Sequence, residues 1–228
     1  MEIEYSRQLR KIAGYIDTLV KGFDVNDPRN HALIVSSLNQ YGDTLHHWAN
    51  NTAGRIMSDI ALRDERTWLI YAKDLSYGVR EQIRRSDISA VYQHLLAEQV
   101  RLIKSLPLEA AQRVHDLSTR ALIDGGRAKE VAGLIMASGQ VSLGRANTIA
   151  RTEISRAASV FVQSRAESLG SDGYIWRTSN DVDVRTSHRE MNGKYVAWNK
   201  PPTLDKMTGH AGCLPNCRCY PDPVIPLD

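Results

Sequence analysis

Cysteine is scarce in this sequence, and so are the features that would mark a secreted protein. The 228 residues contain three cysteines, all between positions 213 and 219. Three is an odd number to pair, and the opening residues lack the basic and apolar stretches of a signal peptide. We therefore expect synthesis in the cytoplasm, a reducing compartment that disfavours a structural disulfide.

Long apolar runs and an excess of one charge are also missing. The longest apolar-rich run without a charged residue, VAGLIMASGQVSLG at 131–144, contains three glycines. A membrane-spanning helix needs about 20 apolar residues, so no membrane association is expected. The chain has 29 basic and 26 acidic residues, a net charge of +3, which gives no general nucleic-acid-binding footprint. A local DNA-contacting patch stays open on the helix that carries Arg145, Arg151, Arg156 and Arg165.

Assembled catalytic motifs are absent from the sequence. There is no P-loop, no HExxH and no nucleophile elbow. The stretch SNDVDVRTSH contains Asp181, Asp183, Arg185 and His188, and a histidine beside a carboxylate can act as a general base. Because Asn and Asp in such a polar stretch commonly form turns, we expect a loop here and no enzymatic activity.

Helical periodicity dominates the first two thirds of the chain. Apolar residues recur every three or four positions, as on the buried face of a helix. One uninterrupted helix is predicted from the stripe Ile34, Leu38, Tyr41, Leu45, Trp48, Thr52, Ile56 and Ile60. Pro107, Gly125-Gly126 and Gly139 are typical of helix ends. The pattern predicts a mostly helical body over residues 1–138.

The character of the sequence changes after Gly170. A last long helix is expected from Leu143 to Leu169, followed by short strands in GYIWRTS and KYVAWN and then a loop rich in proline and glycine. The predicted fold class is α+β. A mostly helical N-terminal body continues through a long connecting helix into a small mixed α/β C-terminal domain, which has short strands and a Cys/His loop. We place the domains at 1–138 and 139–228.

The closing loop GHAGCLPNCRCYPDP concentrates side chains that suit zinc. Zinc binds thiolate and imidazole, and a structural site takes four such ligands in a tetrahedron. The candidate ligands are His188, His210, Cys213, Cys217 and Cys219. Two alternatives stay open: buried thiols that only pack a turn, and a Cys213–Cys217 disulfide in an oxidised protein. An extended CxC disfavours a Cys217–Cys219 bridge.

Several sequence pieces, in a specific order, resemble the C-terminal domain of the phage Mu F-like minor head proteins, the phage head morphogenesis family. The pieces are RANTIARTEISRAAS, YIWRTSNDVDVRTSHREMNGKYVAW, a double proline and PNCRCYPDPVI. Together they span about residues 140–225. The resemblance implies a minor capsid protein of a tailed phage or prophage, found in the virion and assembled in the host cytoplasm.

The same resemblance implies a structural role at the portal vertex in head assembly, with DNA packaging or ejection as further possibilities. The implied partners are portal and major capsid proteins, with packaged DNA as another candidate. Residues 1–138 would then form a region that docks on the capsid or the portal. The alternative is a zinc-dependent hydrolase or nuclease built on His188 and the cysteines, since a catalytic zinc keeps one open position.

The family pattern also suggests roles for single residues. Many members carry cysteine at the position of Arg185 and histidine just before PNCRC, where this chain has Leu214. His188, Cys217 and Cys219 match the pattern, so His210 and Cys213 would replace the missing ligands.

A second group of residues is implied to be structural. These residues are Arg151, Thr152 and Glu153 of the ARTE sequence, together with Asp181 and Arg185. We expect Glu153 to pair with an arginine of the tail, such as Arg185 or Arg189.

Overall fold

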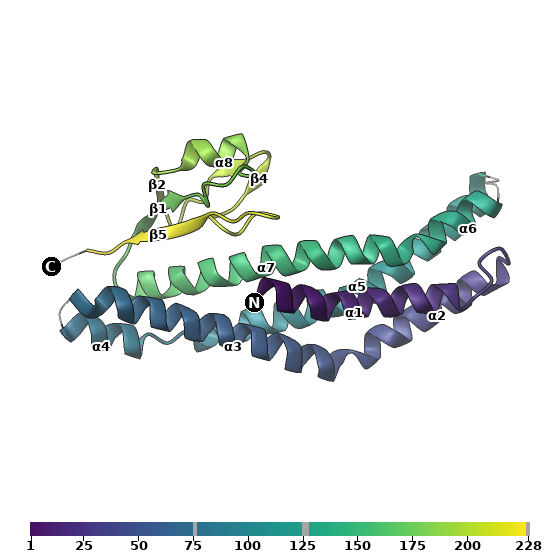
Figure 1. Ribbon diagram of the computed structural model, residues 1–228, viewed down its shortest axis with the longest axis horizontal. Helices are drawn as coiled ribbons and strands as arrows, with labels where there is room; N and C mark the ends of the chain where they lie inside the picture. Colours follow the sequence, from purple (N-terminus) through teal and green to yellow (C-terminus); the bar gives the residue numbers. More distant parts are fainter. Residues whose placement is uncertain (75–76, 125–127, 227–228) are drawn as a thin grey trace. The chain divides into compact units, whose positions relative to one another are not determined.

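The computed structural model describes residues 1–74, 77–124 and 128–226 (Figure 1). The chain forms two compact units. The first consists of Met1, Gly54–Leu96 and Arg151–Asp228, and the second of Glu2–Ala53 and Ala97–Ala150. Helices α3 (His46–Tyr71), α5 (Ser89–Asp124) and α7 (Ser138–Ser168) contribute segments to both.

The second unit is built from helices alone within its described residues. Besides parts of α3, α5 and α7, it contains α1 (Glu2–Lys21), α2 (Arg29–Thr44) and α6 (Ala128–Met136). Its buried side chains include Leu9, Ile12, Ile16, Ile34, Leu38, Ile103, Val114, Ile135 and Ile149. The Tyr5 hydroxyl donates a hydrogen bond of 2.9 Å to Oε1 of Gln99 inside this core, so these two buried polar groups are paired.

The first unit combines helical segments with the small C-terminal α/β part. Its remaining elements are η1 (Ala72–Asp74), α4 (Tyr77–Arg85), β1 (Gly173–Arg177), α8 (Thr186–Met191), β2 (Tyr195–Ala197), β3 (Thr203–Leu204), β4 (Met207–Thr208) and β5 (Tyr220–Val224). Strand β1 lies between β2 and β5 in an antiparallel sheet, with Gly173 opposite both Ala197 and Val224. Strands β3 and β4 form a separate hairpin.

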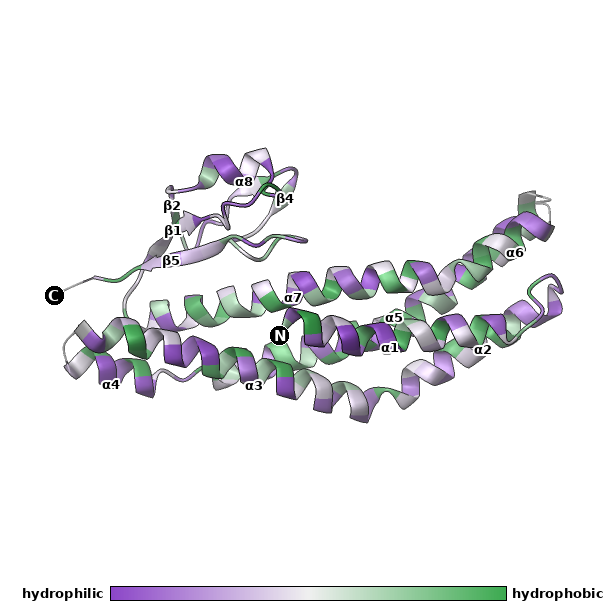
Figure 2. Ribbon diagram, in the orientation of Figure 1, coloured by the Kyte–Doolittle hydropathy of each residue, from purple (hydrophilic) through white to green (hydrophobic). Residues whose placement is uncertain are grey.

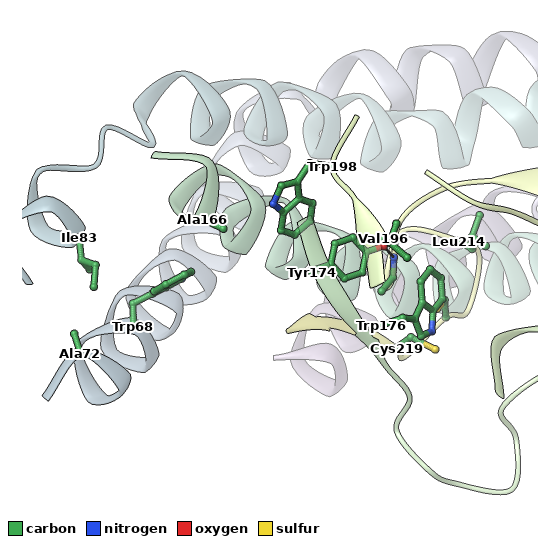
Figure 3. Close-up of a cluster of buried hydrophobic side chains, with 12 residues drawn as sticks. Trp68, Ala72, Ile83, Ala166, Tyr174, Trp176, Val196, Trp198, Leu214 and Cys219 are labelled. Atoms are coloured by element: carbon green, nitrogen blue, oxygen red, sulfur yellow. Dashed lines mark hydrogen bonds between the residues drawn. The ribbon is translucent and has the colours of Figure 1, made fainter. Parts of the chain in front are cut away.

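Large aromatic side chains form the core of the α/β part. Tyr174 and Trp176 project from β1 and are fully buried, with Trp198 beyond the end of β2 (Figure 3). The rings of Tyr174 and Trp198 lie 4.5 Å apart. Cys217 and Cys219 belong to the same buried cluster, so the two thiols contribute to the core as well as to the site described below.

The predicted α+β class is confirmed, but several helix boundaries differ from those expected. The stripe from Ile34 to Ile60 is divided, because α2 ends at Thr44 and α3 begins at His46. Helix α5 continues through Pro107. Gly42 of α2 lies close to that segment, since an added Cβ would come within 3.1 Å of Leu108. Tertiary packing therefore holds the helix across the proline.

Gly139 does not end a helix; it lies in the first turn of α7. An added Cβ at this position would overlap the side chain of Asp17, so the glycine permits the close approach of α1. Helix α7 also starts at Ser138, five residues before the expected Leu143. The predicted stop at Gly125-Gly126 lies outside the described residues.

The helices carry mixed surfaces. Figure 2 shows hydrophilic residues recurring along α1, α3 and α7 between the hydrophobic ones. No helix in the described ranges has the length and hydropathy needed to cross a membrane.

Candidate functional site

Three of the five predicted metal ligands come together in the α/β part. His188 lies on α8, and Cys217 and Cys219 lie in the loop before β5. Their ligand atoms are all within 4.8 Å of one another. The His188 Nδ1 is 3.4 Å from the Cys217 Sγ and 3.6 Å from the Cys219 Sγ. At most 4% of any of the three residues is exposed, so water is largely excluded from this His–Cys centre.

The loop that carries the cysteines is held on helix α7. The Thr152 hydroxyl of α7 accepts a 3.0 Å hydrogen bond from the backbone N–H of Asn216. Asn216 has a φ of 56°, a left-handed conformation that asparagine tolerates better than most residues. The Cys217 N–H donates to the Leu214 carbonyl at 2.9 Å. The threonine of the ARTE sequence is therefore a tether for the cysteine loop.

The charged members of the predicted structural motif have different partners. Glu153 forms an ion pair of 2.9 Å with Arg156, one turn along α7. Arg185 donates to the Pro215 carbonyl at 2.5 Å, and Arg189 donates to the Val184 carbonyl at 3.2 Å. Arg185 thus binds the cysteine loop through backbone rather than through a carboxylate.

Gly212 allows the loop to approach α7 closely. Its φ is 81°, and an added Cβ would overlap the Ser159 hydroxyl and lie 3.1 Å from the Ser155 carbonyl oxygen. We predict that Gly212→Ala lowers the free energy of unfolding by about 2–3 kcal/mol, because strained backbone and overlap act together. Urea unfolding followed by circular dichroism measures this.

Gly144→Ala is the matched control for this substitution, because Gly144 lies within α7 and nothing lies within 4 Å of an added Cβ. It should leave stability unchanged or raise it by about 1 kcal/mol. Equal effects of the two substitutions would contradict the close contact at Gly212.

The two buried thiols of the centre shift each other's pKa in opposite directions. The hydrogen bond from Cys219, supported by the backbone N–H groups of Cys219 and Gly212 and by nearby His188, lowers the pKa of Cys217 to about 5. The same hydrogen bond, together with burial, raises the pKa of Cys219. Of the two sulfurs, Cys217 is therefore the one that the surrounding hydrogen bonds favour as a thiolate.

The imidazole of His188 is oriented from two sides. Its ring packs against Trp176 edge to face, with ring centroids 5.6 Å apart. Nη1 of Arg185 lies 3.4 Å from Nε2. Because a guanidinium has only donors, this contact is a hydrogen bond only in the tautomer in which Nε2 accepts and Nδ1–H points toward the sulfurs. A metal on Nδ1 would require the other tautomer.

A polar cleft of about 150 Å³ lies beside the His–Cys centre. Its lining includes Arg151, Asp181, Arg185 and Arg218 as well as the three ligands. Asp181 accepts hydrogen bonds from the Ser179 hydroxyl at 2.8 Å and the Asp183 N–H at 3.0 Å, and it pairs with Arg218 at 2.9 Å. The Ser179 hydrogen bond is the main reason that the pKa of Asp181 is lowered.

The structure places the other two proposed ligands outside the three-residue group found among the described residues. The Nε2 of His210 is 3.0 Å from the Trp198 carbonyl oxygen and its Nδ1 is 3.2 Å from the Tyr174 hydroxyl. Burial lowers the pKa of His210. Cys213 is a free, partly buried thiol whose pKa is raised to about 11 by burial.

The arginines proposed as a DNA-contacting face differ in their exposure and in their ion pairs. Arg165 is 4% exposed and donates to Asp64, so its inclusion in such a face is wrong. Arg156 pairs with Glu153, and Arg145 pairs with Glu109 at 3.2 Å.

Sequence reasoning missed Asn216, Gly212 and the Asp64–Arg165 pair. Glycine and asparagine within GHAGCLPNC were the available signal for left-handed turns. Nothing in the local sequence marks Asp64 as the partner of a residue 101 positions away.

Comparison with known proteins supports the sequence resemblance. Residues 112–221 match the model of the family described as phage Mu protein F like protein. This match confirms the resemblance, covers the His–Cys centre and begins within α5. The family is one of phage head morphogenesis proteins, which is consistent with a structural rather than catalytic chain.

One curated relative is an uncharacterized protein of Haemophilus influenzae, 34% identical over 131 residues. The alignment covers 58% of this chain but 29% of that protein, so the chain spans less than a third of the relative's length. No solved structure matches.

Proposed function

We propose that this protein is a minor head protein of a tailed phage or prophage, with a structural role at the portal vertex during head assembly. The observation that carries the proposal is the match of residues 112–221 to the Mu F-like family. The proposed partners are portal and major capsid proteins, with packaged DNA as a further contact. Assembly would take place in the host cytoplasm, and the mature protein would reside in the virion.

The way in which the cysteine loop is held supports a structural role. The Thr152 hydroxyl and the Arg185 guanidinium both bind backbone of the segment Pro215–Asn216, and the centre they position is nearly inaccessible to solvent. Such an arrangement stiffens a small α/β part that has few apolar residues outside its aromatic core. Small modules of this kind commonly need a staple.

We propose that the staple is a zinc ion held by His188, Cys217 and Cys219. In a tetrahedral site with Zn–S near 2.3 Å and Zn–N near 2.0 Å, neighbouring nitrogen and sulfur ligands lie about 3.5 Å apart. The Nδ1–Sγ distances of 3.4 and 3.6 Å fit that spacing, and the lowered pKa of Cys217 favours the thiolate that a metal binds. With three protein ligands, the fourth would be a water molecule or a neighbouring side chain.

The zinc-dependent hydrolase or nuclease is the second candidate, and the cleft beside the centre is what favours it. A catalytic site would need a general base there. The carboxylates that line the cleft are Asp181 and Asp183, and both lie within 4.0 Å of Arg218. The Ser179 hydrogen bond lowers the pKa of Asp181, with a smaller contribution from Arg218, which makes this carboxylate a weaker base and favours the structural role.

We predict that the protein is incorporated into phage heads at a few copies per particle and co-sediments with portal or procapsid shells. Peptide mass spectrometry of purified particles, with the major capsid protein as internal standard, measures the copy number. Thr152→Val, which loses the hydrogen bond to Asn216, should reduce incorporation.

Thr148→Val is the control for this assembly assay, because the Thr148 hydroxyl bonds only the Gly144 carbonyl of its own helix among the contacts described for it. It should assemble as the parent does. Absence of the parent protein from both particles and shells would contradict the proposed role.

A further inference from the structure

A groove in the helical unit contains polar side-chain atoms that lack partners. A cavity of about 390 Å³, here the α5–α7 groove, lies between the middle of α5 and the start of α7. Ser138 lines it and is fully buried. Its hydroxyl and the Nε of Arg113, which also lines the groove, have no hydrogen-bond partner among the described residues. Buried polar atoms normally have partners, so a ligand that fits this groove should supply an acceptor.

The chemistry of these two atoms restricts that ligand. The Nε–H of arginine is only a donor, and a serine hydroxyl can donate. Ser138 is also the first residue of α7, where the helix dipole favours negative charge. Arg113 is fixed from its other end, because its Nη2 donates to the Leu134 carbonyl at 3.4 Å. An oxyanion therefore suits the polar part of the groove.

The other residues that line the groove indicate which kind of oxyanion fits it. Leu106, Leu117 and Val141 make part of the groove apolar, and Val141 is 49% exposed. Glu109 and Asp116 also line it, next to Arg120 and Arg145, so the groove carries mixed charge and lacks the uniformly basic surface that a nucleic-acid backbone needs. A single carboxylate attached to an apolar body fits both the donors and the apolar wall.

The carboxylates already present do not fill this role. Glu109 binds Arg145 at 3.2 Å and the Ser105 hydroxyl at 2.9 Å. Asp116 accepts a 2.8 Å hydrogen bond from the Gln112 side chain. Their partners Arg145 and Gln112 also line the groove, whereas the Ser138 hydroxyl and the Arg113 Nε have no partner among the described residues, which leaves these donors to an acceptor from outside the chain.

The geometry points to the α5–α7 groove as a docking site for a partner protein segment in which an Asp or Glu side chain is flanked by apolar residues. The carboxylate binds Ser138 and Arg113, and the apolar neighbours lie on Leu106, Leu117 and Val141. This inference deepens the proposed function, because it gives the chemistry of a partner, and it rests on that function only for the partner's place in the phage head.

The probe is octanoate, which joins a carboxylate to an apolar chain, compared with the uncharged octanamide. Both are titrated into the full-length ¹⁵N-labelled chain while amide shifts are followed by NMR. Octanoate is expected to shift the amides of Arg113 and residues 138–142 with saturation. Octanamide should bind about tenfold more weakly, because it lacks the charge.

Two substitutions separate the groove from nonspecific apolar binding. Ser138→Ala should weaken octanoate about tenfold with an unchanged melting temperature, and Arg113→Lys should act in the same direction. Thr148→Val on α7 is the control, because its hydroxyl bonds the Gly144 carbonyl of its own helix and Thr148 is not among the residues that line the groove; it should bind octanoate as the parent does.

Several outcomes would overturn the inference. These are equal affinity for octanoate and octanamide, shifts located elsewhere, no effect of Ser138→Ala, or saturating shifts at the groove with inorganic phosphate or a short DNA duplex instead. Because no phage particle is needed, failure here leaves the proposed head function intact. Absence from heads, in turn, would leave a positive octanoate result standing.

Discussion

Replacing Arg165 with leucine is expected to lower the free energy of unfolding by about 3–5 kcal/mol, the usual cost of breaking a buried ion pair. The Arg165 side chain is 5% exposed and that of Asp64 is 4% exposed. The guanidinium also donates to the Ile83 carbonyl at 3.0 Å and the Ser86 hydroxyl at 2.7 Å. Without Arg165, the carboxylate would remain buried without its cation and two further acceptors would lose a donor.

A double-mutant cycle tests this explanation. Asp64→Leu combined with Arg165→Leu should cost clearly less than the sum of the two single substitutions, because the second removes the uncompensated charge left by the first. Urea unfolding of all four proteins gives the coupling free energy. Arg29→Leu is the control, because Arg29 pairs with Asp27 while 89% exposed, and it should leave stability nearly unchanged.

The pH dependence of the Arg165→Leu variant has a definite sign. Burial raises the pKa of Asp64, and Arg165 acts in the opposite direction. Loss of Arg165 therefore raises the folded-state pKa further above its unfolded value. Ionisation then destabilises the variant as pH rises, so its deficit should shrink as pH falls from 7 toward 4. Additive single effects with a deficit independent of pH would contradict the explanation.

The sequence predicted the helical elements well because their apolar stripes are continuous. The residues at which helices end were harder, because packing between distant segments decides them. Pro107 lies inside α5 beside Gly42 of α2, and Gly139 lies inside α7 beside Asp17 of α1. A single sequence gives the local preference of proline and glycine but not the helix that approaches them.

The candidate site was also predicted only in part from the sequence. Residue type and family pattern selected His188, Cys217 and Cys219, which the structure brings together. His210 has the right chemistry, but it lies against the Trp198 carbonyl and the Tyr174 hydroxyl. Those contacts depend on how the aromatic core is packed, and nothing in the spacing of His210 from the cysteines indicates them.

The ARTE sequence shows how a motif can be found without its role. The family pattern indicated that Thr152 is structural. The donor of its hydrogen bond, the backbone N–H of Asn216, lies 64 residues away in the sequence. The motif was predicted to act through Glu153, and the threonine proved to be the tether. Charge patterning identifies a carboxylate such as that of Glu153, but not a neutral hydroxyl that accepts a hydrogen bond from the backbone. The sequence therefore indicated the carboxylate.

Zinc is expected in the purified protein at about one ion per chain, and a strong chelator is expected to lower the melting temperature by about 5–10 °C. A ligand at about a hundred times its Kd stabilises a protein by about 2.7 kcal/mol, and each kcal/mol shifts the melting temperature by about 2–4 °C at this size. Elemental analysis and a thermal melt with and without chelator provide the two measurements.

Single substitutions identify the ligands. His188→Ala, Cys217→Ser and Cys219→Ser should each lose zinc and the response to chelator. Cys213→Ser and His210→Ala should keep both, because these residues lie outside the three-ligand group. Loss of zinc on either of the latter would show that the loop rearranges to recruit a fourth protein ligand.

Arg185 provides the sharpest test of how the metal is bound. A zinc ion on Nδ1 of His188 leaves a proton on Nε2, which then needs an acceptor, whereas Arg185 presents a donor at 3.4 Å. Arg185→Gln offers a side-chain carbonyl at this position and removes a positive charge near the ion. It should therefore tighten zinc binding, measured by competition with a chromogenic chelator. Arg189→Gln, whose arginine donates to the Val184 carbonyl, is the control and should leave zinc affinity unchanged.

If no metal is bound, the same contacts predict different effects of the chelator and of the Arg185 substitution. In it, Nδ1–H of His188 donates to the Cys217 thiolate, and Arg185 supplies the positive charge that a metal would otherwise bring. Cys217→Ser would still lower the melting temperature, since the thiolate accepts hydrogen bonds in the core, but the chelator would have no effect on the parent protein. Arg185→Gln removes the hydrogen bond to the Pro215 carbonyl in either case, but without a metal no gain at His188 offsets that loss, so the loop would be destabilised. A protein free of zinc as purified, unresponsive to chelator and weakened by Arg185→Gln, would replace the zinc staple with a hydrogen-bonded one.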